Sequence, residues 1–223
     1  MPIIARSQWV EDFGPVRAFV HTAPRLVHLA REAREDAVSY RGFKVGAAAL
    51  VTNVDGEIRI FDGANYKLRK DDETICAEKS VLNKVIKNKF DRVIAMVVSG
   101  PIQPDRHSGL ELPTLHPCGD CRTLLSVAPQ VQDNTFIMPV HPTLDTYELY
   151  SRREITAIHA AGDSEDAPDE FMYYTDPGFQ IWERGKEDYD ALFNKPMPEA
   201  LSSFSLFQLA RLAVTNSLRP LLI

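Results

Sequence analysis

The sequence predicts an α/β fold in which a sheet lies between two layers of helices. Three observations lead to this prediction. A helical pattern occupies residues 24–40, two strand patterns joined by a tight turn occupy residues 44–65, and helical and strand patterns then alternate as far as residue 140. Such alternation is typical of a three-layer α/β domain and not of an all-helical or all-strand one.

The first predicted element is an amphipathic helix over residues 24–40. Apolar residues recur at helical spacing from Leu26 to Ala37, and charged residues occupy the other face. Two strands are expected next, at residues 44–53 and 57–65. The Asp55–Gly56 pair between them is a good signal for a hairpin turn, so the two strands are predicted to pair.

The second half of the predicted sheet follows a second helix. Residues 76–89 place their apolar side chains on one helical side, which is typical of a helix packed on a sheet. Residues 92–100 form a nearly continuous apolar run, as expected of a strand buried on both faces. After a long loop at 101–117, a short helix is expected from Cys118 and another strand at 135–140.

The composition changes near residue 160. Residues 161–170 are acidic and small, which predicts an exposed linker between a domain of residues 1–160 and an extension of residues 171–223. A terminal helix is expected within 198–218. It is either docked on the core, or it forms a subunit contact or a lid.

Length and charge limit the classes of protein. The chain has 223 residues, three cysteines and a formal net charge of −6. No signal-peptide pattern and no membrane-length apolar stretch are found, so we expect a cytoplasmic protein whose cysteines are reduced. The acidic charge argues against a protein whose main partner is nucleic acid, because phosphate contacts need a basic surface.

The three cysteines are placed as metal ligands would be. Cys118 and Cys121 form a C-x-x-C pair, a common zinc-chelating arrangement, and Cys76 can supply a third thiolate. Three protein ligands leave one position for water, as in catalytic zinc sites. Glu78 lies two residues after Cys76 and can take a proton from that water.

Three thiolates on one Zn²⁺ leave a net charge of about −1, which weakens the metal as a Lewis acid. Compensating cations are therefore expected nearby. Lys79 follows Cys76 by three residues and Arg122 follows Cys118 by four, so each can share a helical face with a ligand. Both cysteine segments also open predicted helices, whose N-termini favour thiolates.

These motifs resemble the zinc-dependent cytidine deaminase superfamily in its three-cysteine form, as found in cytidine deaminases and blasticidin-S deaminase. The matching residues are C-A-E at 76–78 and P-C-x-x-C at 117–121, with FKVGAAAL at 43–50 and GAN at 63–65 as further similarities. The resemblance covers residues 24–140. It implies an α/β/α sandwich around a mixed five-stranded sheet, with residues 1–160 as the catalytic domain.

The resemblance also implies a reaction. Zinc held by the three cysteines would bind hydroxide, which attacks C4 of a cytosine ring, while Glu78 moves protons and ammonia leaves. A cytosine-type nucleoside or nucleoside derivative would become its uracil counterpart. Phe43, Asn65 and Ala77 match positions that contact the substrate in the family. Relatives are dimers or tetramers, so we expect a homodimer or homotetramer.

The chain departs from the family beside the matching asparagine. Lys67 stands where cytidine deaminases carry a glutamate that holds a ribose hydroxyl, and the usual aromatic residue further on falls at Asp71. Lys67 and its basic neighbours either form a solvated turn or reach an anionic group of the substrate, such as a phosphate. The loop at 100–116 is longer than in small relatives, and His107 within it is either an exposed loop residue or part of a lid.

Several alternatives remain open at this point. The substrate can be a nucleotide or another aminated heterocycle. A deaminase of single-stranded nucleic acid would need a basic groove with stacking aromatics, which the sequence lacks. A non-enzymatic module could hold a closed structural zinc, with His116 as fourth ligand. A structural zinc site binds no water, so it has no use for a proton acceptor such as Glu78.

Overall fold

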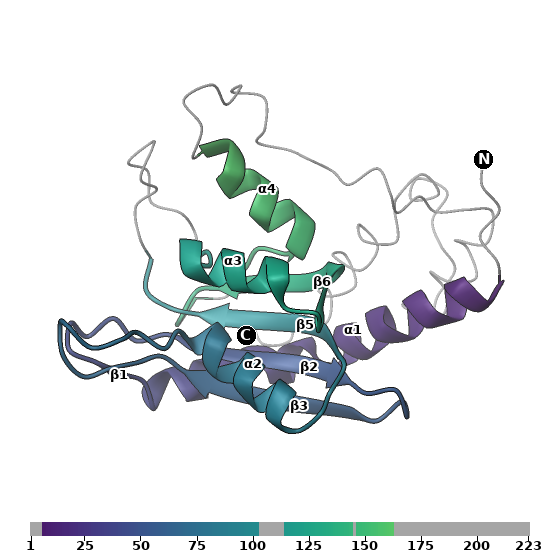
Figure 1. Ribbon diagram of the computed structural model, residues 1–223, viewed down its shortest axis with the longest axis horizontal. Coiled ribbons are helices and arrows are strands. Elements are labelled where there is room, and N and C mark those ends of the chain that lie inside the picture. The colour runs from purple at the N-terminus through teal and green to yellow at the C-terminus, as the bar shows by residue number, and fades with distance from the viewer. Residues whose placement is uncertain (1–5, 103–113, 145, 163–223) are drawn as a thin grey trace. The chain divides into compact units, whose positions relative to one another are not determined.

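The computed structural model describes residues 6–102, 114–144 and 146–162 (Figure 1). The chain divides into two compact units, one of Met1–Pro24 with Thr175–Ile223 and one of Arg25–Tyr174. Of the first unit only residues 6–24 are described. The sheet and the candidate site both belong to the second unit.

Eleven elements are found in the described residues. The helices are α1 (Arg6–Glu35), α2 (Ala77–Lys87), α3 (Gly119–Val127) and α4 (Arg152–Gly162). The strands are β1 (Val38–Ser39), β2 (Gly46–Thr52), β3 (Ile58–Ala64), β4 (Tyr66–Lys67), β5 (Arg92–Ser99), β6 (Val131–Val140) and β7 (Tyr150–Ser151).

The main sheet has five strands in the order β3-β2-β5-β6-β7. β5 and β6 are parallel, and every other neighbouring pair is antiparallel. The predicted mixed five-stranded sheet is therefore confirmed. A separate two-stranded sheet pairs β1 with β4 in parallel.

Helices cover both faces of the main sheet, which confirms the three-layer prediction. Gly46 of β2 faces α1, since a Cβ built there would lie 2.2 Å from the Ala30 carbonyl oxygen. Val45, just before β2, and the alternate residues Ala47, Ala49 and Val51 of β2 face the other way. They join one buried cluster with side chains from α2, α3 and α4, including Val81, Leu82, Val85, Leu125 and Ile155.

The predicted helix at 24–40 was wrong at both ends. α1 begins at Arg6 and runs through Pro15 and Pro24. The spacing of buried side chains explains the extension, because Val16, Phe19, Val20 and Ala23 continue the apolar face of the later turns. The helix ends at Glu35 because the residues after it leave to pair with β4.

The predicted strands and helices between residues 44 and 140 are confirmed, with one large change of boundary. β6 begins at Val131 and not at residue 135. The short strands β1, β4 and β7 and the helix α4 were not predicted. α4 includes the first two residues of the predicted linker, while residues 163–170, the extension at 171–223 and the helix at 198–218 lie outside the described residues. Across the described part of the chain, no helix has the length and apolar character that a membrane span requires.

Candidate metal centre

The sheet topology brings the starts of two helices to one edge. β3 and β5 are both antiparallel to β2, so they run in the same direction. α2 follows β3 in the chain and α3 follows β5, so both helices begin beyond the carboxyl ends of these strands. We call residues 76–78 and 117–122, which form these helix starts, the metal edge.

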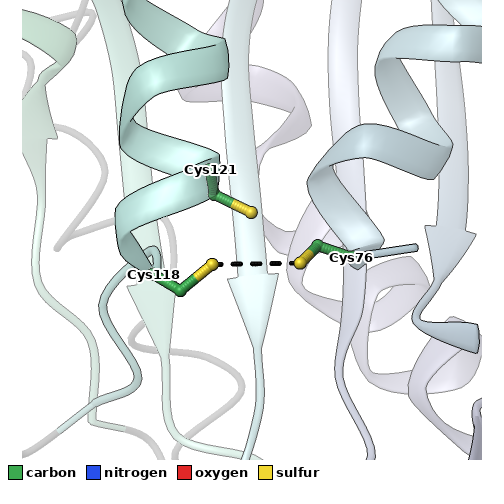
Figure 2. A group of neighbouring side chains, drawn as sticks. All are labelled: Cys76, Cys118 and Cys121. Carbon is green, nitrogen blue, oxygen red and sulfur yellow. Dashed lines mark hydrogen bonds between the residues drawn. The ribbon is translucent and has the colours of Figure 1, made fainter. Parts of the chain in front are cut away.

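The three cysteines meet at the metal edge (Figure 2). Cys76 is the N-cap of α2, Cys118 is the N-cap of α3, and Cys121 lies in the first turn of α3. Their sulfur atoms all lie within 4.8 Å of one another, and the Cys76 and Cys118 Sγ atoms are 3.8 Å apart. In a tetrahedral site with zinc–sulfur bonds of about 2.3 Å, two sulfurs stand about 3.8 Å apart. The three cysteines therefore fit Zn²⁺.

The electrostatics around the sulfurs also suit a metal. The pKa of the Cys118 thiol lies far below its ordinary value, because the Cys121 and Cys76 thiols and the backbone N–H groups of residues 121 and 120 donate to its thiolate. The pKa values of Cys76 and Cys121 are raised, chiefly by their hydrogen bonds with Cys118. Cysteine ligands bind a metal as thiolates, so a bound cation would favour the loss of all three thiol protons.

Glu78 lies buried beside this cluster. It is the second residue of α2 and only 4% exposed. Its pKa is raised to about 7, mainly by burial and further by the negative charge of Cys118, while hydrogen bonds with its own backbone N–H and with Cys121 oppose the shift. A carboxyl group with a pKa near neutrality can both take and give a proton.

The two cations expected at the site have different partners. Lys79 forms an ion pair with Glu73, with Nζ 2.9 Å from Oε1, and both side chains are exposed. Glu73 is the main cause of the raised Lys79 pKa, and Cys76 contributes less. Arg122 folds back on its own helix and donates to the Pro117 carbonyl oxygen at 3.0 Å. That carbonyl directly precedes Cys118, so Arg122 fixes the start of α3.

Two further segments of the chain lie next to the metal edge. We call residues 38–45 and 65–75, which include β1 and β4, the rim ribbon. Tyr66 exchanges two backbone hydrogen bonds with Ile75, at 2.8 and 3.1 Å. Asn65 and Cys76 are the next residues on these two segments, so the rim ribbon leads directly into the metal edge.

Asn65 holds the rim ribbon together. Its Oδ1 accepts a hydrogen bond from the Val45 N–H at 2.7 Å, and its Nδ2 donates to the Phe43 carbonyl oxygen at 2.9 Å. Phe43 is half-buried against the core cluster, and Ala77 is fully buried at the start of α2. Lys67 lies two residues beyond Asn65, at the far end of β4.

His116 does not join the metal cluster. Among the described residues, the group able to hold a metal contains the three cysteines alone. The His116 Nε2 lies 3.0 Å from the Glu148 Oε2. A closed structural zinc with His116 as fourth ligand therefore finds no support in this arrangement.

The partners of His116 were not predicted from the sequence. Glu148 is hydrogen-bonded to His116, to the Thr114 hydroxyl and to the Tyr150 hydroxyl, the last at 2.5 Å. Burial acts to raise the pKa of Glu148, but these three hydrogen bonds outweigh it and leave the pKa below its ordinary value. The group ties the segment that enters Cys118 to the segment before β7. No local sequence signal links these positions. His107 lies outside the described residues.

Comparisons with known proteins support a zinc-binding site at the metal edge. Residues 21–138, more than half of the chain, match the model of the family described as "cytidine and deoxycytidylate deaminase zinc-binding region". The matched range includes every residue of the metal edge and of the rim ribbon.

Similar solved structures include three cytidine deaminases. The enzyme from Burkholderia pseudomallei is 24% identical, over 59% of this chain and 93% of its own, with a TM-score of 0.45. That from Mycobacterium tuberculosis is 30% identical, over 51% and 80%, with a TM-score of 0.39. That from Mycobacterium leprae is 20% identical, over 59% and 93%, with a TM-score of 0.41.

Proposed function

This chain belongs to the cytidine and deoxycytidylate deaminase family, and from that membership we propose that it is a zinc-dependent hydrolytic deaminase. Its substrate is a cytosine-type nucleoside or nucleoside derivative, and its products are the uracil counterpart and ammonia. The burial of Glu78 beside three sulfurs that fit zinc is the observation that carries the proposal.

The residues of the metal edge have different roles in the proposed reaction. Cys76, Cys118 and Cys121 would hold zinc, which when bound supplies a nucleophilic water at neutral pH. Glu78 accepts one proton of that water and passes it to the ring nitrogen N3. It then moves the second proton to the amino group, so that the new C4–O bond replaces the C4–N bond and ammonia departs. The pKa of Glu78, raised to about 7, suits both transfers.

Substrate contacts are proposed from the rim ribbon and α2. Phe43 is half-buried against the core cluster, and its backbone carbonyl oxygen accepts a hydrogen bond from Asn65. Asn65 has a second Nδ2 hydrogen that makes no hydrogen bond within the described residues, and this N–H can donate to a sugar hydroxyl. Ala77 can contribute its backbone N–H, since the first residues of a helix have no intrahelical acceptor for that group.

The charge of the cluster calls for nearby cations. Arg122 and Lys79 are proposed for this role because they lie four residues after Cys118 and three after Cys76, so each can share a helical face with a ligand. Assembly as a homodimer or homotetramer and a cytoplasmic location are also proposed. Light scattering on the purified protein tests the first, and cell fractionation tests the second.

Ammonia release tests the function. Zinc-loaded protein is offered cytidine, deoxycytidine, their monophosphates, cytosine and blasticidin S, beside the variants Glu78→Gln and Glu73→Gln. Glu73 is a matched control because it is an exposed acid five residues away. We expect Glu78→Gln to lose about 10²- to 10⁴-fold in rate with zinc retained, and Glu73→Gln to stay near wild type. Full zinc occupancy with no turnover of any compound would refute the proposal.

A further inference from the structure

We infer that Lys67 and Arg41 form a subsite on the rim ribbon that binds an anionic oxygen group, a phosphate or carboxylate, attached to the substrate. The inference rests on the proposed deaminase function and makes its substrate class narrower. Lys67, which stands where cytidine deaminases carry a glutamate, would then select the substrate. Arg41, which was not predicted from the sequence as a site residue, would act with it.

The first observation is that two positive charges share one aromatic ring. The Lys67 Nζ lies 5.9 Å from the centroid of the Tyr40 ring, and the Arg41 guanidinium carbon lies 5.1 Å from the same centroid. Tyr40 is 40% exposed, Arg41 is exposed and Lys67 is half-buried, so both cations have access to solvent. A ring face attracts cations but carries no net charge, so the positive charge of the pair remains uncompensated.

The second observation is the lack of acidic partners. Within the described residues, neither Lys67 nor Arg41 forms an ion pair or a side-chain hydrogen bond. By contrast, Lys79, Lys84 and Arg59 are each paired with a carboxylate. In a chain with a net charge of −6, cations held without a carboxylate favour the approach of an anion.

The third observation is the position of the pair relative to the reacting atoms. The hydrogen-bonded pair of Tyr66 and Ile75 has Asn65 and Cys76 on one side and Lys67 on the other. Side chains alternate along an extended strand, so Lys67 points to the same side as Asn65. Lys67 is two residues beyond Asn65, a separation of roughly 7 Å along an extended strand. Asn65 is proposed to donate to a sugar hydroxyl, so a group carried by that sugar is the part of the substrate that Lys67 would meet.

The turn after β1 fixes Arg41 at this place. The Tyr40 N–H donates to the Lys67 carbonyl oxygen at 3.0 Å, and the Phe43 N–H donates to the Ser39 hydroxyl at 3.1 Å. Gly42 has a φ of +71°, which suits a glycine in so tight a turn. The turn therefore sets Tyr40 and Arg41 beside Lys67 before any ligand binds.

Ligand chemistry follows from the two cations. Lysine offers a point charge and arginine a planar fork that matches phosphate and carboxylate oxygens. A neutral nucleoside would leave both groups without an acidic partner. We therefore expect the phosphorylated or carboxylated compound to be the better substrate.

Matched substrates and variants provide the test. The kcat/KM values of cytidine, cytidine 5′-monophosphate and cytidine 5′-carboxylate are measured for wild type, Lys67→Gln and Arg41→Gln. Arg59→Gln is the control, because Arg59 also lies over an aromatic ring, that of Phe90, but is paired with Glu57. We expect each subsite variant to lower kcat/KM for the anionic compounds about 10- to 100-fold and to leave cytidine within about twofold. Arg59→Gln should change neither value.

Binding is measured as well, so that the subsite is decided without turnover. The affinity of the Glu78→Gln protein for cytidine 5′-monophosphate should fall when Lys67→Gln is added, and free inorganic phosphate should compete. Equal loss for neutral and anionic compounds would overturn the subsite, as would a wild-type preference for cytidine. In either case turnover of cytidine would leave the deaminase function standing. If phosphate binds at Lys67 but the monophosphate gains nothing over cytidine, the group is an effector site and the inference fails.

Discussion

The metal edge and the rim ribbon lie side by side but are built by different means. Each proposed ligand and the proposed proton carrier of the metal edge stand within one of two short segments, at the start of a helix. The rim ribbon is held by pairings between residues far apart in sequence, such as Val38 with Tyr66 and Tyr66 with Ile75. Burial differs as well, since Glu78 is 4% exposed and Tyr66 is 45% exposed.

This contrast separates the residues proposed to carry out the reaction from those proposed to select the substrate. A metal site needs particular atoms at particular distances, so its residues are restricted in type and spacing. A surface that contacts the variable part of a substrate can change its charges without losing the fold. Lys67, two residues from the Asn65 that ties the rim ribbon together, is the residue for which such a change is proposed. Variants of the metal edge should therefore lose zinc or catalytic activity, whereas variants of the rim ribbon should change stability and substrate binding.

The largest effect is expected at the metal edge. Cys118→Ser removes one of three thiolates and leaves two, which are too few for a stable zinc site. Zinc content measured by mass spectrometry should fall from one per chain to near zero, and deaminase activity should fall with it. Glu78→Gln is the matched comparison, because it should lose activity and keep zinc. Retention of zinc by Cys118→Ser would contradict the assigned ligand set.

A smaller effect is expected where the two regions join. Asn65→Ala leaves the Val45 N–H and the Phe43 carbonyl without their side-chain partners. The free energy of unfolding should fall by about 1–3 kcal/mol for each group that stays buried, and KM should rise. Denaturant unfolding and substrate titration measure the two effects. Asn65→Asp keeps the acceptor for Val45 and should recover part of the stability. An Asn65→Ala protein with wild-type stability and KM would show that Asn65 does not hold the ribbon.

A third change tests the support behind the metal edge. Glu148→Gln cannot accept from Thr114, His116 and Tyr150 together, so the free energy of unfolding should fall by about 1–3 kcal/mol at neutral pH. The pKa of Glu148 is lowered in the folded protein, so its contribution is present above the ordinary glutamate pKa and is lost as the pH falls through the folded-state value. Unfolding curves of wild type and variant should therefore converge below about pH 4. The exposed acid Glu57 provides a control, as Glu57→Gln. A difference that stayed constant from pH 7 to pH 3 would rule out the ionised carboxylate as the cause.

The smallest effect is expected at Lys79. Its charge is shared with the exposed Glu73, and exposed pairs contribute about 0–1 kcal/mol. Lys79→Gln should change kcat less than about fivefold, and more at low salt than at high salt, because exposed charges are screened. A loss of a hundredfold would show that Lys79 contributes far more to the charge balance of the sulfurs than an exposed cation paired with Glu73 is expected to. The rates of Lys79→Gln and Glu73→Gln at two salt concentrations distinguish these cases.

The same contrast explains what could be predicted from the sequence. Helix α2 followed from apolar periodicity and the Cys118–Cys121 pair from its spacing, which are local signals. Cys76 is 42 residues from Cys118, and its place in the cluster followed from the zinc-site motif and the family resemblance. β1 and β4 are two residues long, and only their pairing makes them strands, so no periodicity could reveal them. Glu148 is 32 residues from His116, and their contact depends on the whole arrangement of β6 and β7. The two prolines concealed the start of α1, although the buried spacing from Val16 onward was present.

Zinc titration of the metal-free protein tests the central claim most directly. Ammonia release from the best substrate is recorded while the zinc bound per chain is counted. We predict no activity without metal, a linear rise with bound zinc, and a plateau at one zinc per chain, with Glu78→Gln binding the same zinc and remaining inactive. Activity that does not follow bound zinc, or that persists in Glu78→Gln, would contradict the account.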